Sequence, residues 1–110
     1  YRQEQRYGEA FDLLENAIKL APRSAPAYYE LGLTALASRQ RLDRAEQTLR
    51  IYLMLGQQEA NQPPLDDAHV QLGKVYELEH RKDDARSAYQ AALMQNPQSE
   101  AAREALQRLR

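Results

Sequence analysis

The sequence of 110 residues contains no cysteine and no tryptophan, and it has only four glycines. Without cysteine there is no disulfide framework, no thiolate nucleophile and no zinc site built on sulfur ligands. An excess of one charge is also lacking, because 15 lysines and arginines accompany 16 aspartates and glutamates. Since no overall positive field draws the chain to nucleic acid or to an anionic membrane surface, we expect no nucleic-acid partner.

Long apolar runs are missing as well. None approaches the ~20 residues that a membrane-spanning helix needs, so we expect no direct membrane insertion. The composition is instead 43% hydrophobic and 28% charged, which is typical of a folded domain. A chain of this length has room for one such domain, and we expect residues 1–110 to form it. Arginine outnumbers lysine 12 to 3, a bias that suggests a bacterial source.

Two short patterns recur along the chain, and their spacing is helical. Residues at offsets 0, 4 and 7, or 0, 3, 4 and 7, share one face of a helix, so each repeat should be two amphipathic helices whose apolar faces meet. One pattern occurs as Ala10, Leu14, Ala17, Pro22, then Ala45, Leu49, Tyr52, then Ala85, Tyr89, Ala92, Pro97. The other occurs as Tyr28, Leu31, Gly32, Ala35 and as His69, Leu72, Gly73, Tyr76.

These residues resemble the tetratricopeptide repeat, whose pattern of about 34 residues is aromatic-x2-Leu-Gly-x2-Tyr, then Ala-x3-aromatic, then Pro. The copy from His69 to Pro97 matches best and departs only in having histidine at the aromatic position. The middle copy has Gln57 where the family has the closing proline. The resemblance implies an all-α, right-handed superhelical solenoid of antiparallel helix pairs.

The repeat register divides the chain into about two and a half repeats and a capping helix. The expected units are a partial repeat at 1–22, a repeat at 23–64, a repeat at 65–98 and the cap at 99–110. The expected helices are the end of one at about 1–5, then 8–20, 24–38, 43–57, 65–81, 83–95 and 99–109. Because Tyr1 falls near the end of a helix, we expect a fragment of a longer polypeptide.

An unusually long connection is expected between the second and third repeats. The interval from Ala45 to Ala85 is 40 residues, against 35 from Ala10 to Ala45. The additional residues fall in 56–64, where Gly56 ends a helix and paired prolines favour an extended chain.

Four residues are expected to cap helices, and acidic pairs mark helix starts. Ser24 and Ser99 are candidate N-caps, and Asp43 and either Asp83 or Asp84 are candidates for the second helices. The pairs Asp66-Asp67 and Asp83-Asp84 could also form a carboxylate dyad or a cation site, but a helix start is the simpler explanation.

Catalytic chemistry has no basis in the sequence. His69 and His80 are the only histidines, and eleven residues of helix separate them by ~16 Å, too far for one metal. There is no glycine-rich phosphate loop and no nucleophile with its base. Acidic residues interleave with Arg39, Arg41, Arg44 and Arg50, which favours a solvated helix face over a nucleic-acid track. We therefore expect no catalytic residue, no metal and no cofactor.

The resemblance implies that the first helix of each repeat lines a concave groove for an extended or helical peptide. Leu31, Gly32 and Ala35 face the partner helix, which leaves a separate stripe for the groove. The predicted groove residues are Tyr29, Leu33, Leu36, Val70, Lys74 and Glu77. Some family members grip a terminal carboxylate with lysine, asparagine and arginine here, and this chain lacks that set. The alternative is that Tyr29 and Leu33 are covered by a neighbouring repeat that this fragment lacks.

A second candidate interface follows from residues 51–55, which are apolar at five consecutive positions. On a helix such a run is apolar around the whole circumference, so one side must meet something beyond the repeat core. The long connection or the next repeat could cover it, or it could serve a partner or self-association. The residues concerned are Ile51, Leu53, Met54 and Leu55.

The sequence thus predicts a non-catalytic interaction module that binds a protein or peptide in its groove. The alternative is a structural spacer or oligomerisation platform, with self-association, inside a larger polypeptide that could also carry an enzymatic domain.

Overall fold

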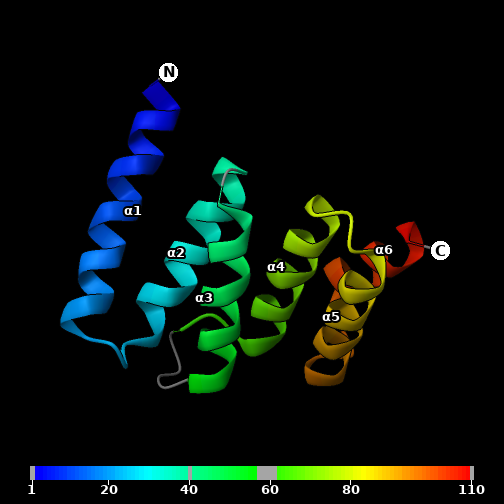
Figure 1. The fold of residues 1–110 in the computed structure, drawn as a ribbon. Coiled ribbons are helices and arrows are strands. Elements are labelled where there is room, and N and C mark those ends of the chain that lie inside the picture. Colours follow the sequence, from blue (N-terminus) through cyan, green and yellow to red (C-terminus); the bar gives the residue numbers. More distant parts are fainter. Residues whose placement is uncertain (1, 40, 57–61, 110) are drawn as a thin grey trace.

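The computed structural model describes residues 2–39, 41–56 and 62–109, and all regular secondary structure within these ranges is α-helical. The six helices are α1 (Arg2–Leu20), α2 (Ala25–Ser38), α3 (Leu42–Leu55), α4 (Leu65–Leu78), α5 (Lys82–Gln95) and α6 (Glu100–Arg108). Successive helices run up and down beside one another, with α2 packed on α3 and α4 packed on α5 (Figure 1). The expected all-α architecture of helix pairs is confirmed.

One expected helix boundary is wrong. Helix α1 is continuous over Arg2–Leu20, whereas a break between about residue 5 and residue 8 was expected. No proline lies within these residues, and Gly8 costs a helix only about 1 kcal/mol relative to alanine, which is too little to end it. The other helix ends lie within three residues of their expected positions. Residues 57–61, most of the expected long connection, lie outside the described residues.

The capping expectations hold at one helix and fail at others. The Ser99 side chain accepts from the Ala102 N–H at the start of α6, whereas Ser24 occupies the N-cap position of α2 without a side-chain cap bond. The N-cap residues of α3 and α5 are Arg41 and Arg81, where an aspartate was expected. The carboxylates pair with arginine side chains one turn away, as Asp83 with Arg86 and Asp84 with Arg81. At α5 the helix-start acids are therefore present as ion-pair partners.

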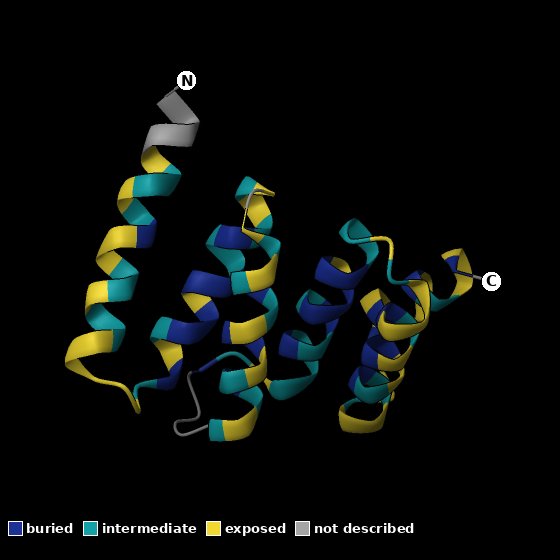
Figure 2. Ribbon diagram, viewed as in Figure 1, coloured by how far each residue is buried: buried dark blue, intermediate teal, exposed yellow. Residues whose placement is uncertain are grey.

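The core lies where the paired helices face each other, shown dark blue in Figure 2. Its largest fully buried side chains include Tyr52, Tyr89 and Leu49. Glycine is required opposite two of them, because an added Cβ would lie 2.6 Å from Tyr89 at Gly73 and 2.8 Å from Leu49 at Gly32. The missing side chains allow the helices of each pair to cross closely, which positions α2 and α4 as neighbours on one side of the molecule.

Candidate binding groove

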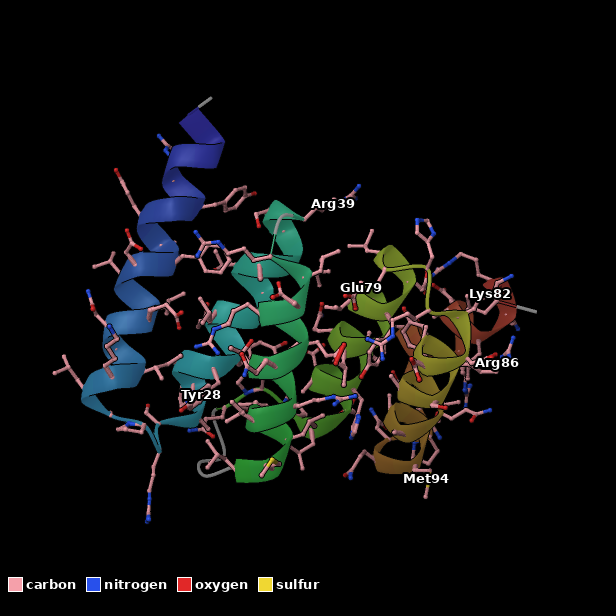
Figure 3. The ribbon with its side chains drawn as sticks, in the orientation of Figure 1. Tyr28, Arg39, Glu79, Lys82, Arg86 and Met94 are labelled. Carbon is pink, nitrogen blue, oxygen red and sulfur yellow. The ribbon has the colours of Figure 1, made fainter. Side chains whose placement is uncertain are left out.

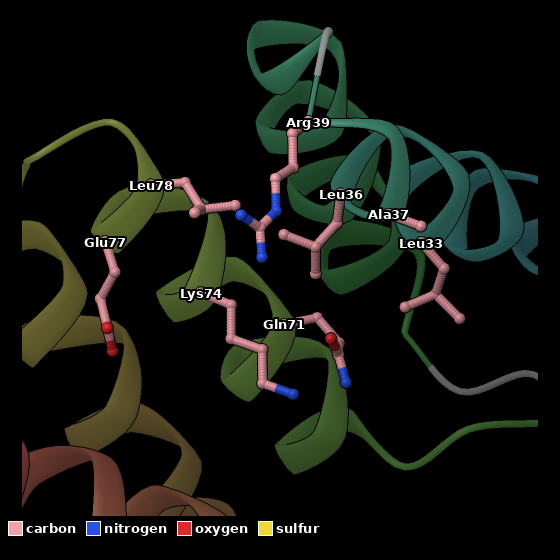
Figure 4. Close-up of a pocket in the computed structure, with 8 residues that line it drawn as sticks. All are labelled: Leu33, Leu36, Ala37, Arg39, Gln71, Lys74, Glu77 and Leu78. Carbon is pink, nitrogen blue, oxygen red and sulfur yellow. The ribbon is translucent and has the colours of Figure 1, made fainter. Parts of the chain in front are cut away.

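A groove of about 490 Å³ lies between α2 and α4. The two helices contact each other directly, so the groove spans two successive helix pairs. Its lining residues are Leu33, Leu36, Ala37 and Arg39 from the α2 side, and Gln71, Lys74, Glu77 and Leu78 from α4 (Figure 4). Four of the six predicted groove residues, Leu33, Leu36, Lys74 and Glu77, are thus brought together.

Leucines from both helices form the apolar part of the groove. Leu33 and Leu36 are half-buried and pack against the core with one side, which leaves the other side in the groove. Leu78 is half-buried on α4, and Figure 4 shows it across the groove from Leu36. Covering such surface is worth roughly 25 cal/mol for each Å² removed from water. The groove therefore offers an apolar contact to a ligand.

Two cations of the groove have no intramolecular partner in the described part of the chain. Arg39 and Lys74 are both exposed, and neither side chain forms a hydrogen bond or ion pair within residues 2–39, 41–56 and 62–109. Figure 4 shows the Arg39 guanidinium between the side chains of Leu36 and Leu78, and the Lys74 and Gln71 side chains extending from α4. These groups are placed to contact a ligand.

The charge of Glu77 is already compensated within the chain. Its Oε1 accepts a hydrogen bond from the Tyr89 hydroxyl at 2.6 Å and pairs with the Arg108 guanidinium at 2.7 Å. Burial, together with the bond to Glu77, raises the pKa of Tyr89, and that same carboxylate raises the pKa of Arg108. Because Glu77 is neutralised in this way, Arg39 and Lys74 give the groove a positive electrostatic character.

Tyr29 and Val70, the other two predicted groove residues, lie inside the protein. Tyr29 is 4% exposed and Val70 is 3% exposed. The Tyr29 ring packs at 5.1 Å on the Tyr52 ring, and its hydroxyl donates to Asp67. This desolvation raises the pKa of Tyr29. Helices α3 and α4 of this chain therefore cover Tyr29, whereas the alternative placed the cover in a repeat that the chain lacks.

The helical stripe missed four lining residues. Ala37 and Leu78 lie one residue beyond the positions considered, and Gln71 lies three residues before Lys74 on the same face of α4. Arg39 follows α2, where its φ of 59° ends the helix in the left-handed region. Ala37, Gln71 and Leu78 each directly follow a predicted groove residue, so a wider stripe would have included them. Nothing in the spacing indicates where Arg39 lies.

The apolar run at 51–55 is mostly buried by packing within the chain. Tyr52 is fully buried and donates to the Pro63 carbonyl at 2.6 Å, so the end of the connection lies against α3. Ile51, Leu53 and Leu55 are half-buried against the core, and Met54 alone of the run is exposed, at 85%. Met94 is equally exposed, at 86%, on α5 (Figure 3).

Other candidate chemistry is accounted for by internal contacts. Arg44 pairs with Glu15, Arg50 donates to the Tyr76 hydroxyl, and Arg41 lies over the Phe11 ring. His80 lies beyond the end of α4, and within the described ranges no three acidic or histidine residues could hold a metal ion. None of the described helices is long and apolar enough to cross a membrane.

Comparison with known proteins relates this geometry to a family. A family model described as a tetratricopeptide repeat matches residues 1–63, and a second model with the same description matches residues 66–99. Among solved structures, the OM64 TPR domain from Arabidopsis superposes with a TM-score of 0.79 at 24% sequence identity, covering 99% of this chain and 84% of that one. The expected fold is thereby confirmed. No curated protein matches the sequence.

Proposed function

Because the chain belongs to the tetratricopeptide repeat family, whose domains are generally protein-interaction modules, we propose that it binds a peptide or partner helix in the groove between α2 and α4. The observation that carries this proposal is the groove itself, in which half-buried leucines lie beside polar groups without internal partners. Concave sites of this kind, apolar with a few oriented polar groups, are typical of ligand-binding surfaces.

Binding would use the apolar wall for affinity and the polar groups for orientation. Apolar side chains of the ligand pack on Leu33, Leu36 and Leu78, as in other helix-lined peptide grooves. The Gln71 amide, which has no partner among the described residues, can both donate to and accept from a ligand backbone. No step of this binding involves catalysis.

The test is capture of partners from a lysate of the source organism, with identification by mass spectrometry. Leu33→Arg should abolish capture by placing a charge on the apolar wall. Ala37→Trp should do the same by filling the groove from an exposed position, without removing any core side chain. Leu13→Arg is the matched control, since Leu13 is 71% exposed on α1, outside the groove. Equal capture by all four proteins would overturn the proposal.

A second candidate function is that of a structural platform that self-associates. Met54 and Met94 occupy equivalent places, each nine residues after the alanine that opens the second helix pattern, and both are more than four-fifths exposed. Flexible thioether side chains suit adaptable apolar contacts. Sedimentation should then show mass rising with concentration, and Met54→Lys with Met94→Lys should prevent the rise. A constant monomer mass would exclude this alternative.

A further inference from the structure

We propose that the occupant of the groove is an internal acidic-apolar segment of a protein, whose side-chain carboxylates pair with Arg39 and Lys74 while its apolar side chains pack on the leucines. This inference rests on the proposed function and specifies the chemistry of the ligand. It follows from charge complementarity, because the groove combines an apolar wall with two cations that lack internal anions.

The cationic character of the groove is a local property. The whole chain has a formal net charge of -1, and its other groove charge, Glu77, is compensated by Arg108. The only acidic residue on α2 is Glu30, which does not line the groove. Glu77, the one carboxylate among the residues that line the groove, is paired with Arg108, so a ligand carboxylate can approach Arg39 or Lys74 without displacing an internal anion from either cation. Charge-assisted hydrogen bonds of this kind are shorter and stronger than neutral ones.

The backbone of Arg39 supports a role for its side chain. Its φ of 59° lies in the left-handed region, which glycine adopts freely and which a side chain disfavours. The residue ends α2 in this conformation, and its guanidinium lies between Leu36 and Leu78 (Figure 4). An arginine here thus places a cation beside the apolar wall at the cost of a less favourable helix end.

The positions of the cations favour side-chain carboxylates over a chain terminus. Arg39 lies at the end of α2 and Lys74 in the middle of α4, so the two come from opposite walls of the groove. The two remaining predicted groove positions, which could have supplied further hydrogen-bond donors for a terminal carboxylate, hold Tyr29 and Val70, and both are buried. Two separate carboxylates along one segment fit this arrangement better than one terminal group.

The first experiment is selection from a randomised peptide library displayed on phage, where a coat-protein fusion leaves no free peptide carboxyl terminus. The intact chain is compared with Ala37→Trp, which fills the groove. We expect peptides that combine Asp or Glu with Leu, Ile or Phe to be enriched on the intact chain alone. Enrichment of apolar peptides without an acidic excess, again on the intact chain alone, would overturn this inference and leave the proposed function standing. If no peptide is enriched on the intact chain beyond its enrichment on Ala37→Trp, both this inference and the proposed function are overturned.

The second experiment measures the affinity of the most enriched peptide, made with an amidated terminus and a fluorescent label, by anisotropy. Arg39→Gly and Lys74→Gln should each raise Kd by about fivefold at low salt, and added salt should reduce the difference. A peptide with Gln in place of its acidic residues should bind the unaltered chain about as weakly as the original peptide binds the two variants. Unchanged affinity for Arg39→Gly and Lys74→Gln would overturn the inference.

His80→Gly is the matched control for Arg39→Gly. His80 has a φ of 61°, so glycine relieves the same backbone conformation, but this residue does not line the groove. Both glycine variants should raise the midpoint of thermal unfolding. Only Arg39→Gly should weaken peptide binding, and because this variant is the more stable protein, the loss could not result from unfolding.

Discussion

The hydroxyl of Tyr29 on α2 donates a hydrogen bond to the Asp67 carboxylate on α4 and thereby joins the two helices that line the groove. The Tyr29 ring also packs on Tyr52, so this side chain of α2 contacts both α3 and α4. All of these contacts lie within the chain. A groove held in this way requires little reorganisation when it binds, which lowers the entropic cost of association.

Removal of the Tyr29 hydroxyl should weaken this connection. Tyr29→Phe leaves the half-buried Asp67 without its donor, and we expect the free energy of unfolding to fall by about 1 to 2 kcal/mol in urea denaturation. Tyr7→Phe is the control, because the Tyr7 hydroxyl has no hydrogen-bond partner among the described residues. Equal losses in the two variants would show that the Tyr29 bond contributes nothing specific.

Stability should depend on pH through His69. Burial lowers the pKa of His69, an effect that Asp66 partly offsets, so the folded chain resists protonation of this ring more than the unfolded chain does. The free energy of unfolding should therefore fall as pH decreases from 7.5 through the unfolded value of about 6.5 to 5.5. His69→Gln should flatten this dependence in urea titrations, whereas the exposed His80→Gln should retain it. An unchanged slope in His69→Gln would contradict the assignment.

The glycines should respond in opposite directions to the same substitution. Gly73→Ala would place a Cβ 2.6 Å from the fully buried Tyr89 ring, and we expect a loss of about 1 to 3 kcal/mol. Gly8→Ala has nothing within 4 Å of its Cβ in the middle of α1 and should gain about 1 kcal/mol. Thermal unfolding compares the two directly. A stabilised Gly73→Ala would mean that α4 and α5 can separate without penalty.

The two serine N-caps provide a further matched pair. Ser99→Ala removes the side chain that accepts the Ala102 N–H at 3.4 Å, which should lower stability by about 1 kcal/mol. Ser24→Ala removes no such bond, because the Ser24 side chain does not cap α2, and should have a smaller effect. Chemical denaturation monitored by circular dichroism measures both. A larger loss in Ser24→Ala would reverse this assignment of the caps.

Helical spacing could predict those groove residues whose position depends only on the helix to which they belong. Leu33 and Leu36 share a face of α2, and Lys74 and Glu77 share a face of α4, because 3.6 residues per turn decides which side chains are neighbours. The same spacing placed Tyr29 on that face, yet α3 and α4 cover it. Spacing identifies the face of a helix but not which of its turns a neighbouring helix covers.

The sequence by itself determined the helix pairs, their order and the small residues at their crossings, because these depend on local periodicity and on the volume of single side chains. Tertiary structure alone decided that Tyr29 and Val70 are buried, that Arg108 neutralises Glu77, and that Arg39 extends into the groove. The physical reason is that each of these depends on atoms far away in the sequence. The charge of the groove is therefore a result of packing between repeats.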